Sequence, residues 1–123
     1  MLMLAAILAT LTPAPSKPSP NLINRIELRL SRKRCVAPLS RWWRHYSFSH
    51  EGSTDRRFVD VWFIEAGHEN LLAGRFITEP EPPMLDDSQF RLVSAKYEIA
   101  TGRFVRFECG LNHPDKPANW NGR

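Results

Sequence analysis

The side chains that could do chemistry in this sequence are few, and the most obvious are four histidines: His45, His50, His68 and His113. Together with Asp60 or Glu65, an imidazole can hold a metal ion or act as an acid–base pair. The first two histidines lie five residues apart and point to opposite sides of a strand, and the other two fall in predicted loops. We therefore interpret all four as turn and surface residues, and we predict no catalytic residue, no metal site and no cofactor.

An acidic, proline-rich segment at residues 79–87 carries carboxylates of the kind that bind Ca²⁺. Its spacing differs from that of an EF-hand loop, and three prolines restrict how the segment can wrap around an ion. We interpret it as an exposed, rigid connector. No nucleophile elbow, phosphate-binding loop or HExxH motif occurs elsewhere in the chain.

Two cysteines, Cys35 and Cys109, lie near opposite ends of the body without a CxxC spacing, and their state depends on the compartment. Residues 1–11 are apolar and lead into a proline-rich stretch, a pattern that resembles an export signal. This run is about half of the roughly 20 residues that a membrane-spanning helix needs. We predict a signal peptide over residues 1–16, an exported (periplasmic or secreted) protein without a transmembrane segment, and one disulfide. If the leader is not real, two free buried thiols are expected instead.

Charge is distributed unevenly along the chain. Residues 17–44 contain eight basic residues and one acidic residue, a net charge of +7, whereas residues 45–123 contain nine basic and twelve acidic residues, a net charge of −3. A basic segment of this kind attracts nucleic acid, anionic lipid headgroups or acidic polymers, or it folds back against the acidic body of its own chain. The sequence leaves both alternatives open.

The motif Arg41-Trp42-Trp43-Arg44 combines flat aromatic rings with guanidinium cations. Neighbouring residues on a strand point to opposite faces, so one tryptophan belongs to the core and the other lies exposed beside the arginines. Such a patch suits a protein, a glycan or an anionic envelope surface as the partner. We predict a partner-binding surface at Arg41, Trp43 and Arg44.

The secondary-structure signals describe one helix followed by strands. Ser19 is a suitable N-cap and Pro20 a suitable first helical residue, and the apolar residues that follow share one helical face: Leu22, Ile23, Ile26 and Leu30. Alternation over residues 26–30 fits a strand as well, but the cap favours a helix. Alternating and β-branched patterns predict strands at 44–50, 57–65, 71–78, 90–99 and 103–109, with a turn at 51–55, a hairpin turn at 67–70 and a bulge at Gly74.

These elements predict an α+β fold in which one N-terminal helix packs on an antiparallel meander sheet of about five strands. The domain spans residues 17–123, with a loose tail from about residue 110. This layout is similar to the cystatin-like and NTF2-like layouts, in which a helix lies across a curved antiparallel sheet. The similarity concerns the predicted topology and implies no site residues.

The leading functional hypothesis is a small exported domain that binds a partner or associates with the cell envelope and has no catalytic activity. One alternative is a small enzyme with a pocket inside a cone-shaped sheet and His45 or Asp60 as the general base. Another is a cytoplasmic nucleic-acid-binding protein, which requires that the leader is not real. Under the leading hypothesis, nucleic acid is not the partner.

Overall fold

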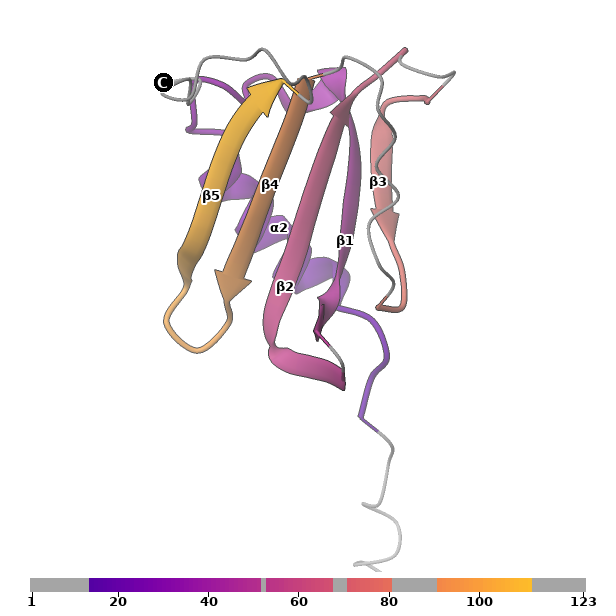
Figure 1. The fold of residues 1–123 in the computed structure, drawn as a ribbon, viewed down its shortest axis with the longest axis vertical. Coiled ribbons are helices and arrows are strands. Elements are labelled where there is room, and N and C mark those ends of the chain that lie inside the picture. Colours follow the sequence, from indigo (N-terminus) through magenta and orange to yellow (C-terminus); the bar gives the residue numbers. More distant parts are fainter. Residues whose placement is uncertain (1–13, 52, 68–70, 81–90, 112–123) are drawn as a thin grey trace, which may run out of the picture.

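In the part of the chain that the structure describes, a five-stranded sheet carries one α-helix across one of its faces (Figure 1). The structure is a computed structural model, and it describes residues 14–51, 53–67, 71–80 and 91–111. Most of the predicted signal peptide and of the predicted loose tail lies outside these residues. The elements are α2 (Pro20–Leu30), a 3₁₀ turn η1 (Leu39–Arg41), β1 (Trp42–Glu51), β2 (Ser53–Glu65), β3 (Gly74–Ile77), β4 (Arg91–Glu98) and β5 (Arg103–Leu111).

Helix α2 begins where the sequence predicts. The Ser19 hydroxyl accepts a hydrogen bond from the backbone N–H of Leu22 at 3.2 Å, and Pro20 occupies the first turn, where a helix needs no N–H donor. The predicted apolar face is buried against the sheet. The helix prediction is therefore confirmed, and the alternative of a strand over residues 26–30 is wrong.

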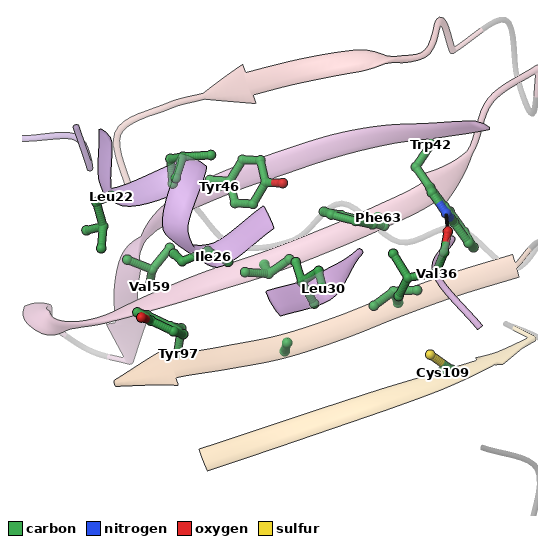
Figure 2. Close-up of a cluster of buried hydrophobic side chains, with 14 of the residues drawn as sticks. Leu22, Ile26, Leu30, Val36, Trp42, Tyr46, Val59, Phe63, Tyr97 and Cys109 are labelled. Carbon is green, nitrogen blue, oxygen red and sulfur yellow. Dashed lines mark hydrogen bonds between the residues drawn. The ribbon is translucent and has the colours of Figure 1, made fainter. Parts of the chain in front are cut away.

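The core lies between α2 and the sheet (Figure 2). On β1, alternate side chains point toward the helix, so Tyr46 and Phe48 join the core while Ser47 and Ser49 point the other way. Tyr46 meets Phe63 of β2 edge to face, with the ring centroids 5.8 Å apart. Trp42 is the buried member of the tryptophan pair, and its indole N–H donates to the backbone carbonyl of Val36.

The sheet is mixed, so the predicted antiparallel meander is wrong, although the α+β class is confirmed. The strand order is β3-β1-β2-β4-β5, and β3 runs parallel to β1. One edge of β2 pairs with β1 and the other with β4, so no edge of β2 is left for a hairpin with β3. Residues 67–70 were predicted to form that hairpin turn, and residues 68–70 lie outside the described part.

Bulges occur at positions that the sequence did not indicate. Gly74 pairs regularly with Trp43, so the predicted bulge at that glycine is wrong. The register of β1 against β2 shifts instead after Phe48, where residues 56–58 have no partner on β1. Both strands extend into the predicted turn at 51–55. There the Asp55 carboxylate accepts from the backbone N–H of Arg57 at 3.1 Å and binds its guanidinium, which supports the irregular backbone.

A disulfide joins Cys35, in the turn after α2, to Cys109 on β5, as the sequence predicts. The two Cα atoms are 6.4 Å apart, and the sequence separation is 74 residues. Both cysteines are buried. The bond therefore ties the segment after the helix to the last strand of the sheet.

Replacing Cys35 with Ser should lower the free energy of unfolding, because the closed loop restricts the unfolded chain. The chain-entropy model gives about 4 kcal/mol as the upper size of this effect for so long a loop. Thermal unfolding of wild type and C35S, each with and without a reductant, measures the loss. Equal melting temperatures under oxidising conditions would show that the bond contributes no stability.

Candidate functional site

The three residues of the predicted partner-binding surface do not share one face of the sheet. Trp43 projects away from α2 and is half-buried, with its ring 5.5 Å from that of His45 and 5.7 Å from that of Phe76. Arg44 projects toward the helix. Arg41 donates to the backbone carbonyl of Cys35 at 2.9 Å and lies over the ring of Trp42. Binding by these three residues remains a prediction.

Several charged and polar groups of the sheet surround Glu27, a buried carboxylate on the sheet side of α2. The hydroxyl of Tyr46 on β1 donates to one carboxylate oxygen at 2.6 Å. Arg75 on β3 donates to both oxygens, and Arg44 Nε lies 3.4 Å from Oε2. We call Glu27, Arg44, Tyr46 and Arg75 the Glu27 cluster.

The register of the sheet brings the two arginines of the Glu27 cluster together. Arg44 and Arg75 are paired neighbours on the parallel strands β1 and β3, so their side chains lie on the same face. Two adjacent guanidinium groups repel each other unless an anion lies between them. Glu27 supplies that anion, and Asn24, one turn earlier on the helix, accepts a further hydrogen bond from Arg75 at 2.8 Å.

Burial and pairing act in opposite directions on the Glu27 carboxyl. Burial alone raises its pKa, but the hydrogen bonds from Arg75 and Tyr46 and the charges of both arginines outweigh that effect, and the pKa falls below its usual value. Burial and the bond to Glu27 raise the pKa of the Tyr46 hydroxyl. Glu27 therefore stays ionised, and Tyr46 stays protonated, throughout the neutral range. Both oxygens of Glu27 are already engaged, so the cluster holds the helix on the sheet.

Sequence reasoning missed the Glu27 cluster, although a signal was present. Glu27 is the only acidic residue between positions 17 and 44, and it lies one turn after Ile23 and three residues before Leu30, on the apolar helical face. A lone carboxylate at a position that must be buried requires a cation opposite to it. Arg44 was interpreted instead as part of an exposed patch with its neighbouring tryptophan.

The histidines that the structure describes are not gathered into a site. His45 is buried on the side of the sheet away from α2, where its Nε2 lies 2.8 Å from the Thr78 hydroxyl, and His50 is exposed. His68, His113 and most of the acidic segment 79–87 lie outside the described residues. Within the described part, no group of three or more potential metal-ligating side chains comes together.

The basic segment after residue 17 divides into two groups. Arg41 and Arg44 are engaged with their own chain, as described above. The remaining cations of α2 and the turn after it are exposed to solvent: Arg25, Arg29, Arg32, Lys33 and Arg34. Among the described residues, none of these five forms an ion pair with a carboxylate. Of the two alternatives that the sequence left open, the described residues favour a basic segment that faces outward.

Comparisons with known proteins give no match: no family model fits the chain, and neither the curated proteins nor the solved structures that were searched contain a significant relative. In the part of the chain that the structure describes, no helix combines the length and the apolar character needed to cross a membrane.

Replacing Glu27 with Gln should lower the free energy of unfolding by about 2 kcal/mol at neutral pH, because both arginines would lose their anion in a partly buried setting. The ordinary pKa of this carboxyl is 4.5 and folding lowers it, so its contribution is complete above about that pH and is lost as the pH falls through the folded value. We therefore expect the stability difference between wild type and E27Q to narrow below pH 4.5.

Denaturant unfolding of both proteins across this pH range measures the difference. Glu108→Gln is a matched control, because it removes an exposed carboxylate from β5 and should change stability by less than about 0.5 kcal/mol. If the difference in the free energy of unfolding between wild type and E27Q stayed constant with pH, an ionised Glu27 would be ruled out as the source of the stabilisation.

Proposed function

We propose that this protein is a small exported domain that binds a partner or the cell envelope and has no catalytic activity. The observation that carries the proposal is the disulfide between Cys35 and Cys109, because such bonds persist in oxidising compartments and are rare in the cytosol. The apolar start of the chain, with the features of an export signal, agrees with it. The partner is a protein, a glycan or an anionic surface of the envelope.

The distribution of polar groups supports binding over catalysis. The Glu27 cluster engages its carboxylate in helix–sheet contacts, and burial and bonding keep the Tyr46 hydroxyl protonated, so these groups are used to fix the fold. At the other side of the sheet, Trp43 and the exposed ring of Phe76 lie 5.7 Å apart at the β1–β3 edge. An aromatic pair of this kind can stack on a partner without any chemical step.

The intact mass of the protein from its native host tests both parts of the export proposal. We expect a mass that lacks about sixteen N-terminal residues, with thiols that become alkylated only after reduction. A full-length mass with two reactive thiols would overturn the proposal and favour a cytoplasmic protein. A shortened mass with free thiols would retain export and contradict the role of the disulfide.

A further inference from the structure

The outer side of α2 and the turn after it form a cationic surface, which we call the basic face; its members are Arg25, Arg29, Arg32, Lys33 and Arg34. The exposure of Arg25 and Arg29 follows from the helix itself, because the apolar residues and Glu27 occupy the opposite side. Lys33 also lies over the ring of Phe107 on β5, 5.0 Å from its centroid, which holds the start of the turn against the sheet.

Three acidic residues of the sheet lie on the other side of the molecule, whereas Glu65 is the register partner of Trp42 on the helix side and forms an ion pair with Arg91. Strand alternation and register place three carboxylates, Asp60, Glu98 and Glu108, on the face that points away from α2. The same face also carries three cations, so these charges balance: Lys96, Arg103 and Arg106. The helix side, in contrast, has five exposed cations, and its one carboxylate on α2 is buried and paired. The described part of the domain is therefore electrostatically one-sided.

An exposed leucine lies within this cationic surface. Leu28 is 59% exposed and follows Arg25 by three residues, so these two side chains are neighbours on the outer side of α2. A lone apolar side chain among arginines suits the boundary between lipid headgroups and acyl chains, where both kinds of side chain are stabilised. Single-stranded nucleic acid is bound instead by cations beside aromatic rings on which bases stack. The ring beside these cations in the described residues, that of Phe107, is already covered by Lys33, and Trp43 points to the opposite side of the sheet.

We propose that the basic face docks on a membrane surface containing anionic lipids, with the arginines at the level of the phosphates and Leu28 at the edge of the acyl region. This inference rests on the proposed function in one respect: export determines which membrane the protein meets. In this orientation α2 lies along the bilayer, and the other face of the sheet remains available to a second partner. Each cation near an anionic surface strengthens binding by a factor of about five, and salt weakens the attraction.

The test measures sedimentation of the full chain with vesicles of phosphatidylcholine alone or mixed with phosphatidylglycerol. Replacing Arg25 and Arg29 with Gln should weaken binding to the mixed vesicles about 30-fold. Replacing Arg103 and Arg106 with Gln removes the same net charge from the other side of the sheet and should weaken binding less than about threefold. The apolar start of the chain is common to all variants, so it does not affect their comparison.

A second measurement separates lipid from other polyanions. Leu28→Ser should weaken binding to the mixed vesicles about fivefold and leave binding to a DNA duplex of similar charge density unchanged. An equal loss of vesicle binding in the two double arginine variants would show that only the net charge matters, and it would overturn the proposed docking surface. Duplex binding as tight as vesicle binding, with no effect of Leu28→Ser on either, would identify a nucleic-acid surface instead. Equal binding to neutral and anionic vesicles would also contradict the proposal.

These results are distinguishable from a failure of the export proposal. A protein that is shortened and disulfide-bonded in its host but does not bind mixed vesicles would retain the proposed export and exclude the lipid surface. A full-length protein with free thiols that bound mixed vesicles through the basic face would exclude the proposed export and retain the lipid surface.

Discussion

The buried carboxylate of Glu27 is the constraint on which the arrangement of helix and sheet depends. A buried charge is very unfavourable unless cations and hydrogen-bond donors surround it. Here Tyr46 of β1 and Arg75 of β3 donate hydrogen bonds, and Arg44 of β1 adds a second positive charge 3.4 Å away. The side of the helix that carries Glu27 must therefore face these side chains of β1 and β3. Any rotation about its axis would separate the carboxylate from its partners, and the exposed arginines would turn toward the core.

Local signals predicted the elements well because each signal acts over a few residues. The Ser19 cap and Pro20 define the start of α2 by a single hydrogen bond and a missing N–H, and alternation along β1 shows which side chains face the helix. Neither signal says which strand becomes the neighbour of which. The position of β3 beside β1 depends on the second edge of β2 being taken by β4, a contact between segments far apart in the sequence. The mixed sheet was unpredictable for this reason.

The candidate surface illustrates the same limit for side chains. The sequence showed that Trp42 and Trp43 must point to opposite faces, and the structure places Trp42 in the core. By the same alternation, however, Arg44 shares a face with Trp42 and not with Trp43. A patch of consecutive residues on a strand therefore cannot have all its members on one side. The lone acidic residue on the apolar side of α2 was the better indicator, because its burial required cations that only a distant strand could supply.

Two attachments at opposite edges of the sheet fix what the helix presents to solvent. Glu27 binds Arg75 on β3, the strand at one edge, and the segment after the helix is joined through Cys35 to Cys109 on β5, the strand at the other edge (Figure 1). A helix held by only one of these attachments could still pivot over the apolar core, because hydrophobic contacts are not directional. Held at both edges, α2 keeps one side inward, and its remaining arginines form a preorganised surface. A partner that binds there need not order the helix first, which removes part of the entropic cost of association.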